Sequence, residues 1–220
     1  MTSKEIQLKV GSVDELARFT AQQLHNMFPQ HGLEFDVQQV KSLCPAALAR
    51  MSPILAAVRN FTPNVFNHFN ALQYASFLYL LANESWQRHE KAEFPDRLFC
   101  LSRALGGLDL FYAVTMPEVF FISHGLGAVI GNANYGNSLV IFQNVTVGRV
   151  GDDRPIIGED VVLYPNSSVT GRSVVGNRSV ISANTHVHNA TVPDDTVVFM
   201  HEGELVFKPR RKDYRALYFR

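Results

Sequence analysis

Hydrophobic residues across positions 1–112 recur at intervals of three and four, the spacing that predicts helices with one buried face. Ser12 and Glu15 form a capping-box pair immediately before the first of these apolar series. Further along, Thr62 followed by Pro63 is typical of a helix N-terminus, because proline is tolerated in the first helical turn. We therefore expect this part of the chain to form a helical domain.

A repeat of six replaces the helical spacing after this domain. Steps of six from Leu139 land on Ile, Leu or Val at eight of nine positions: Leu139, Val145, Gly151, Ile157, Leu163, Val169, Val175, Ile181 and Val187. Four residues after the later steps come small or β-branched residues: Val161, Ser167, Ser173, Ser179, Thr185 and Thr191. A fixed short period indicates a stack of similar units that cannot bury their apolar residues alone.

The six-residue period predicts a β-solenoid in which three strands form one triangular coil. The aliphatic residue of each hexad points inward, and a small residue lies near each tight corner. Glycine and asparagine, such as Gly171, Asn177 and Asn184, tolerate the turn conformations that the corners require.

Two stretches within this region resemble a known family. Residues 122–131, ISHGLGAVIG, are similar to the catalytic-histidine stretch of serine acetyltransferases, and residues 139–148, LVIFQNVTVG, to their signature strand. With the hexads from Ile157 to Val192, the chain resembles the hexapeptide-repeat acyltransferases, and their serine acetyltransferase branch in particular.

The residue patterns and the resemblance together predict an α+β fold with three parts. A helical domain at 1–112 is followed by a left-handed parallel β-helix acyltransferase domain at 113–200 and a basic C-terminal tail at 201–220. The family arrangement further implies a homotrimer, either alone or paired into a hexamer.

The implied activity is transfer of an acetyl group from acetyl-coenzyme A to a hydroxyl. Such transfer needs a base near the hydroxyl, and imidazole suits that role near neutral pH. His124 matches the family's catalytic histidine, so the resemblance implies that it is the general base. Coenzyme A would bind between two β-helices of the trimer, mainly through backbone groups near Gly148, Pro165 and Ala183, and no metal is implied.

The stretches that bind the acceptor in the family are altered in this chain. The run Asp152-Asp153-Arg154-Pro155 stands in a shortened loop where the family has Asp-Arg-His-Pro, and Ser123 stands where the family has aspartate. We expect Ser123, Asp153 and Arg154 to contribute to acceptor binding, with Arg154 able to hold a carboxylate or phosphate bidentately. The alternative for Arg154 is a solvated loop side chain. The predicted acceptor is a small molecule with a hydroxyl, such as a surface-glycan sugar or an unusual amino acid.

A general base of this type usually needs a group that orients its second ring nitrogen. The stretch VTMPEVFF lacks the family's Asp-Ile-His-Pro run, so the orienting carboxylate is open between Glu118 and Asp109. Either residue could equally be a solvated charge or a helix cap.

Composition excludes several other classes of function. Formal net charge is zero, with 20 basic and 20 acidic residues, which argues against nucleic-acid binding and against attraction to an acidic membrane. The N-terminus has no apolar core of signal-peptide length and the chain has no 18-residue apolar span, so we expect a cytoplasmic protein.

The basic C-terminal tail either helps hold the 3′-phosphate of coenzyme A or is a solvated end. It finishes in Arg220, so we do not expect the docking of isoleucine-ended serine acetyltransferases into the sulfhydrylase.

Three other functions remain open from the sequence. The first is true serine acetylation in a rearranged pocket. The second is a metal enzyme like the γ-class carbonic anhydrases, for which His124, His186 and His188 lack the expected spacing. The third is a non-catalytic scaffold that would not bind coenzyme A.

Overall fold

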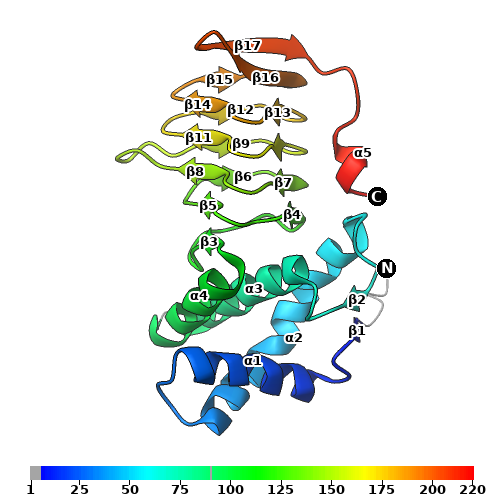
Figure 1. Cartoon of the computed structure of the whole chain (residues 1–220), viewed down its shortest axis with the longest axis vertical. Coiled ribbons are helices and arrows are strands. Elements are labelled where there is room, and N and C mark those ends of the chain that lie inside the picture. Colours follow the sequence, from blue (N-terminus) through cyan, green and yellow to red (C-terminus); the bar gives the residue numbers. More distant parts are fainter. Residues whose placement is uncertain (1–5, 90) are drawn as a thin grey trace.

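The computed structural model describes residues 6–89 and 91–220 and places a helical domain at one end of a stack of short strands (Figure 1). The helices are α1 (Val13–Met27), α2 (Leu33–Ala57), α3 (Ala71–His89) and α4 (Glu93–Gly106). A small parallel sheet of β1 (Gln7–Leu8) and β2 (Val65–Phe66) lies beside them. No helix in these described ranges is both long and apolar enough to cross a membrane.

The first helix begins where the capping box predicted. The Ser12 hydroxyl accepts a hydrogen bond from the Glu15 amide at 3.2 Å and donates one to the Glu15 carboxylate at 2.8 Å. The first of these bonds satisfies an amide that the first helical turn leaves without a partner.

The helix predicted to begin at Thr62 begins instead at Ala71. The side-chain oxygen of Asn70 accepts from the amides of Leu72 and Gln73 at 3.1 and 3.2 Å, which caps α3. The segment before it pairs with β1 as strand β2. The helix start that Thr62 and Pro63 predicted is therefore not used, because Asn70 is a stronger N-cap and the segment before it pairs with a strand distant in sequence.

The strands form three parallel sheets, one for each side of a triangular coil (Figure 1). The first sheet contains β4 (Phe120–Ile122), β7 (Leu139–Ile141), β10 (Val162–Leu163), β13 (Val180–Ile181) and β16 (Thr196–His201). The second contains β3 (Asp109–Leu110), β5 (Val129–Ile130), β8 (Thr146–Gly148), β11 (Ser168–Thr170) and β14 (His186–His188). The third contains β6 (Asn134–Tyr135), β9 (Ile156–Ile157), β12 (Val174–Val175) and β15 (Thr191–Val192).

The strand pairing puts the aliphatic residues into inward columns. The columns are Ile141, Leu163, Ile181 and Val198 in the first sheet, Val147, Val169 and Val187 in the second, and Ile157, Val175 and Val192 in the third. Each of these side chains is at most 2% exposed. Full burial of one such side chain stabilises the fold by about 1.5–3 kcal/mol.

The register predicted from Leu139 is corrected at one point. Val147 and Ile157 occupy equivalent inward positions but lie ten residues apart in the sequence, because a loop of extra residues interrupts the period. Gly151 lies in that loop, is exposed and has a φ of 60° instead of pointing inward. Leu139 and Val145 are buried, but they precede the inward Ile141 and Val147 by two residues and belong to the second series.

The second series is otherwise buried at the corners, except for its last member. Val161, Ser167, Ser173, Ser179 and Thr185 are all at most 1% exposed. Thr191 is exposed, because the equivalent positions Val187 and Val192 are five residues apart and not six.

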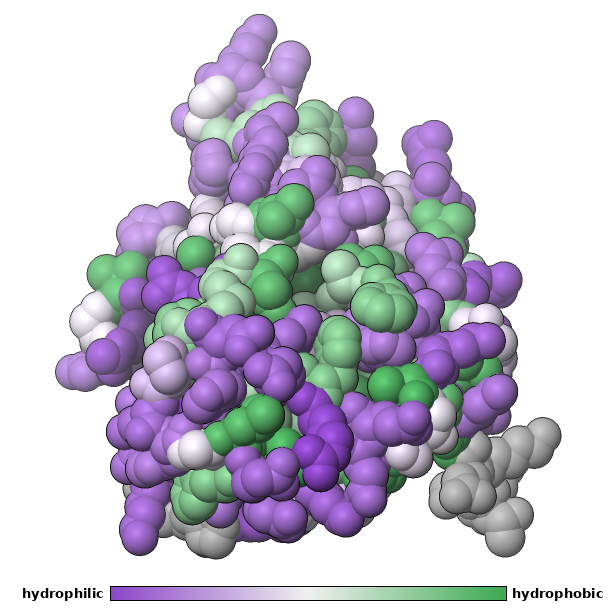
Figure 2. Space-filling view, turned by 60° about the horizontal axis from the view of Figure 1, so that its bottom comes forward, coloured by the Kyte–Doolittle hydropathy of each residue, from purple (hydrophilic) through white to green (hydrophobic). Residues whose placement is uncertain are grey.

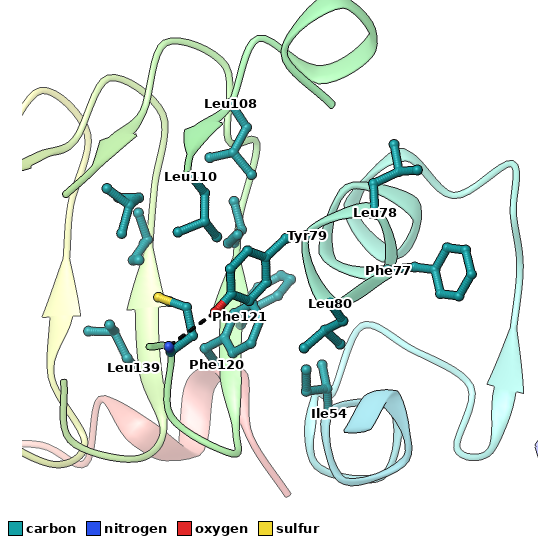
Figure 3. Close-up of a cluster of buried hydrophobic side chains, with 14 of the residues drawn as sticks. Ile54, Phe77, Leu78, Tyr79, Leu80, Leu108, Leu110, Phe120, Phe121 and Leu139 are labelled. Carbon is teal, nitrogen blue, oxygen red and sulfur yellow. Dashed lines mark hydrogen bonds between the residues drawn. The ribbon is translucent and has the colours of Figure 1, made fainter. Parts of the chain in front are cut away.

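The side chain of Tyr79 joins the helical domain to the first coil (Figure 3). Its hydroxyl donates to the Val114 carbonyl at 2.6 Å and accepts from the Met116 amide at 3.2 Å. Its ring packs edge-on against Phe120 with the ring centres 6.1 Å apart. Because Tyr79 is 2% exposed, this contact holds α3 against the coil that precedes the candidate site.

The C-terminal segment continues the β-structure and then returns to the helices. Strand β16 forms an antiparallel hairpin with β17 (Glu204–Pro209), and the chain then runs back along the stack to α5 (Arg215–Tyr218), beside α2 (Figure 1). Phe219 bridges Val58 and is 1% exposed. The parallel strands thus begin at Asp109, ahead of the boundary predicted at 113, and ordered structure continues through the segment expected to be a tail.

Candidate active site

His124 lies in an enlarged corner between the first and second sheets. Six residues, 123–128, link β4 to β5, whereas four residues link the equivalent strands in each later coil. His124 has a φ of 59°, a left-handed conformation that non-glycine residues adopt at a cost, and its carbonyl accepts from the Leu126 amide. The corner is therefore a specific departure from the repeat at the predicted catalytic residue.

A ladder of asparagines explains why His124 stands apart from the regular corners. Asn144, Asn166 and Asn184 all have positive φ. The side-chain amide of Asn144 donates to the side-chain oxygen of Asn166, and that of Asn166 to Asn184, both at 3.0 Å. Gly127, with a φ of 70°, caps this ladder, because a Cβ at Gly127 would overlap the Asn144 side-chain oxygen. Since Gly127 takes the ladder position, the extra residues of the corner carry His124 outside the stack.

The exposed imidazole of His124 lines a pocket of about 220 Å³ between this corner and the helices. The other lining residues come from α3, from the end of α4 and its following turn, and from the corner: Ala71, Leu72, Ala75, Leu105, Gly106, Leu108, Ile122, Gly125 and Leu126. His124 is the one titratable residue among them. In the part of the chain that the structure describes, its ring makes no side-chain hydrogen bond. A reacting hydroxyl in this pocket would thus meet a free imidazole in an otherwise apolar surrounding.

Of the two candidate orienting carboxylates, Asp109 is the one at the His124 corner. It begins β3, and its amide donates to the Ala128 carbonyl at 2.9 Å, within the enlarged corner. Its carboxylate lies 3.6 Å from Nε of Arg103, and both side chains are partly exposed. Asp109 is thereby placed on the adjacent coil, already next to a positive charge.

Glu118 lies at the opposite end of β4 from His124. It faces α2 and lines a pocket of about 360 Å³ with Arg50 and Pro53, among other residues. Within one chain, Glu118 and the imidazole therefore lie at different corners of the coil. One hexad is one side of the triangle, and residues six apart therefore lie at different corners.

The predicted acceptor-binding residues separate into two places. Ser123 is 6% exposed, and its amide donates to the Ile141 carbonyl at 2.7 Å, next to His124. Asp153 and Arg154 lie in the exposed loop that projects from the stack after β8 (Figure 1). This loop follows the C-terminal end of β8, whereas the His124 corner precedes the N-terminal end of β5. Because β5 and β8 are parallel neighbours, the loop and the corner lie at opposite edges of the second sheet. One chain alone therefore does not bring Arg154 to His124.

The residues predicted near coenzyme A are divided in the same way. Pro165 and Ala183 lie in the corners stacked beyond the His124 corner, and the Asn184 amide donates to the Pro165 carbonyl at 3.0 Å. Gly148 ends β8 at the other edge of the second sheet, where a Cβ would meet nothing within 4 Å. The backbone near Gly148 is accordingly open to a ligand.

The histidines of β14 face outward, as their spacing around Val187 predicted. Nδ1 of His186 is 3.0 Å from the Ser168 hydroxyl, and Nδ1 of His188 is 3.0 Å from the Thr170 hydroxyl. Among residues 6–89 and 91–220, no group of three or more His, Cys, Asp or Glu side chains is arranged to hold a metal ion.

Sequence reasoning missed the helical wall of the pocket. Ala71, Leu72, Ala75 and Leu105 have the spacing of ordinary helix residues and carry no motif. Only the docking of α3 and α4 against the first coil assigns them to a site.

Comparisons with known proteins agree with this architecture. No family model matches the chain. A serine acetyltransferase of Bacillus subtilis (strain 168) is 34% identical over 122 residues, which cover 53% of this chain and 56% of that protein. The chain thus matches about half the length of this curated relative.

Two solved structures show the same fold. The serine acetyltransferase of Neisseria gonorrhoeae superposes with a TM-score of 0.74 and 19% identity, over 94% of this chain and 83% of that chain. A serine acetyltransferase in complex with CoA superposes with a TM-score of 0.71 and 20% identity, over 87% of this chain and 84% of that chain. The predicted fold, a helical domain followed by a left-handed parallel β-helix of hexapeptide repeats, is confirmed.

Proposed function

We propose that this protein is an acetyl-coenzyme A dependent O-acetyltransferase that acts through His124 on a small-molecule hydroxyl other than that of free serine. The observation that carries the proposal is the placement of the His124 imidazole, which has no side-chain partner among the described residues, in a strained enlarged corner at the edge of a pocket. The likeness of the sequence and fold to serine acetyltransferases, one of them solved with CoA, supports acyl transfer from a thioester.

The reaction would be a direct transfer between two bound substrates. The His124 ring takes the proton of the acceptor hydroxyl as its oxygen attacks the acetyl carbonyl. The bond between that carbonyl and the sulfur of coenzyme A breaks, and the protonated imidazole returns its proton to the leaving thiolate. Asp109 is the better-placed carboxylate to orient the ring, and Ser123 is beside it to contact the acceptor.

The complete site requires a neighbouring copy of the chain. Arg154 and Asp153 lie at the opposite end of the second sheet from His124, so they can reach a His124 pocket only from another protomer. We propose a homotrimer in which Gly148 and this loop face the corner of a neighbour that carries His124, Pro165 and Ala183. Coenzyme A would then lie in the groove between them. The cytoplasmic location inferred from the sequence stays a prediction.

The direct test is a screen of hydroxyl compounds with acetyl-coenzyme A, with release of free thiol as the readout. With an active acceptor in hand, His124→Ala should lower turnover by roughly a hundredfold to ten thousandfold. Coenzyme A affinity should change little, because its proposed contacts are mainly backbone groups. His186→Ala is the matched control, since that ring is exposed on the same β-helix.

Three outcomes would contradict the proposal. Absence of coenzyme A binding by the purified protein would favour a non-catalytic scaffold. Turnover of the His124→Ala enzyme within a few fold of the parent would remove the imidazole from the mechanism. A transfer rate to free serine above that to every other compound would overturn the assigned acceptor class.

A further inference from the structure

The loop between β8 and β9 contains a short hairpin that carries an exposed apolar side chain. The Val150 amide donates to the Asp153 carbonyl at 2.9 Å, and the Asp153 amide donates to the Val150 carbonyl at 3.2 Å. Residues that exchange both bonds are directly opposite each other, and their side chains project from the same face. Val150 is 52% exposed. The hairpin therefore holds a valine and a carboxylate side by side, outside the stack.

The rim of the His124 pocket is also apolar and exposed. Leu126 in the enlarged corner is 64% exposed and Leu105 near the end of α4 is 46% exposed, and both line the pocket. Figure 2 shows hydrophobic side chains gathered near the middle of the face that carries the helical domain, within a largely hydrophilic surface. Apolar side chains that gather on a surface in this way mark a region that another molecule covers.

The charged side chains beside this rim are complementary to those of the hairpin. Arg103 lies one helical turn before Gly107, and its Nε is 3.6 Å from the Asp109 carboxylate. Both side chains are partly exposed. The hairpin carries Asp153 beside Val150, with Arg154 directly after it. The two surfaces can thus meet with a carboxylate opposite Arg103 and a guanidinium opposite Asp109.

The hairpin and the rim lie at nearly the same level of the stack. Strand β5 follows the His124 corner, and β8, which leads into the hairpin, is its hydrogen-bonded neighbour. The two features are therefore one strand spacing apart along the stack, about 4.8 Å. Rotation about a trimer axis that runs along the stacks leaves this level unchanged. In the proposed trimer, the hairpin of one copy accordingly lies at the level of the rim of the next.

Resting on the proposed trimeric acetyltransferase, we propose that Val150 of one copy packs on Leu126 and Leu105 of the next copy and closes its His124 pocket. Asp153 beside the valine pairs with Arg103. The hairpin is thus a lid that a neighbouring copy supplies, and each complete site combines the corner of one chain with the hairpin of another. Closure excludes water from the imidazole, the acceptor hydroxyl and the thioester.

A disulfide between two copies tests the contact without an activity assay. In a Cys100→Ser background, which removes the exposed native thiol and leaves the buried Cys44, the chain carries Val150→Cys together with Leu126→Cys. We expect mild oxidation to give covalent dimers and trimers on a non-reducing gel, and reductant to reverse them. The control pair is Val150→Cys with Leu217→Cys, because Leu217 is similarly exposed, at 50%, but lies on α5. This pair should stay uncoupled.

The same preparation separates failure of the lid from failure of the proposed function. If light scattering shows a trimer but the Val150 and Leu126 pair couples no better than the control pair, the lid is wrong and the acetyltransferase function is untouched. A parent protein that releases thiol as a monomer would also overturn the lid alone. If the parent transfers acetyl to no acceptor, the proposed function fails, while the cross-link still decides the contact.

A charge on the lid should impair the site of the neighbouring copy. Val150→Asp places a carboxylate against two leucines, so kcat/KM for the best acceptor should fall at least about tenfold. Val174→Asp is the matched control, because it adds the same group at an exposed valine on the third sheet. Equal kcat/KM for Val150→Asp and the parent would contradict the lid.

Mixed trimers show which chain supplies each part. A His124→Ala chain keeps its hairpin, and a Val150→Asp chain keeps its imidazole. Random assembly of equal amounts makes about a quarter of the sites intact, because each site draws its two parts from different chains. We therefore expect the co-expressed chains to recover about a quarter of the parent rate. A rate no higher than the mean of the two separate variants would show that hairpin and imidazole act within one chain.

Discussion

Gly127 packs against the side-chain oxygen of Asn144, so closely that any Cβ on the glycine would overlap it. This contact joins the enlarged His124 corner to the asparagine ladder that runs down the stacked corners. The geometry of the candidate base is thus tied to the regular part of the β-helix through one glycine.

Replacing this glycine should disturb the site more than the fold. Gly127→Ala combines a left-handed backbone, which costs about 1–2 kcal/mol for alanine, with the overlap at Asn144. We expect a lower unfolding temperature and, in the acetyl-transfer assay, a fall in kcat larger than any change in coenzyme A affinity. Gly203→Ala is the control, because Gly203 also has a positive φ but open space around it. Equal effects of the two variants on kcat would show that the contact does not matter for the site.

An added carboxylate should lower the stability of the fold at an inward position of a strand but not at the neighbouring outward position. Val175 is 1% exposed and its neighbour Val174 is 36% exposed. Val175→Asp would place an unpaired carboxylate in a closed apolar column and should destabilise the fold by several kcal/mol. Val174→Asp should be close to neutral. Thermal unfolding of both variants decides the point, and similar melting of the Val175→Asp variant and the parent would refute the register.

The C-terminal arginine should be a stabilising clamp. The Arg220 guanidinium donates to the carbonyls of Ala56, Val58, Arg59 and Phe61 at 2.7–3.0 Å. These carbonyls lie at and just after the C-terminal end of α2, where helix carbonyls lack partners within the helix. Arg220→Met should therefore destabilise the protein by about 1–3 kcal/mol.

Two measurements check the clamp. Chemical denaturation should show the loss for Arg220→Met but not for Arg211→Met, an exposed arginine in the same segment. Limited proteolysis should also release the α5 segment faster from the Arg220→Met protein. Unchanged proteolysis would mean that the buried Phe219 holds the segment without the arginine.

Acid should weaken one set of contacts between the last coil and the returning segment. The Arg178 guanidinium, aided by Arg210, lowers the pKa of Asp195 below its ordinary value of 3.8. Because the pKa is lower in the folded protein, the stabilisation is complete above the ordinary value and disappears as the pH falls through the folded-state pKa.

This dependence predicts how a neutral variant behaves. Asp195→Asn should melt below the parent at pH 7, and the difference should shrink steadily below about pH 4. Asp152→Asn, in the exposed loop, serves as the control for removal of a carboxylate. A difference between Asp195→Asn and the parent that stays constant down to pH 2 would show that the lowered pKa is not its origin.

The sequence alone determined the β-helix and the position of its candidate base. The inward columns follow from the repeat of six. The conformation of each hexad depends on its own turn residues and on contact with the neighbouring coil, so a local pattern is enough to predict it. Val169 and Ile181 could be assigned inward for this reason. A repeat count cannot detect an inserted loop, however, and the column drawn from Leu139 crossed one at Gly151.

Tertiary structure alone decided what surrounds His124. Glu118 and Asp109 were equivalent candidates in the sequence, and only the triangular path of the chain separates them to different corners. Ala71, Leu72 and Leu105 belong to helices far from His124 in sequence, where no local pattern marks a residue as part of a pocket wall. The return of Arg220 to α2 is equally invisible to local reasoning. Such contacts join segments whose secondary structure is determined locally. The relative placement of these segments depends on side chains buried between them, such as Tyr79.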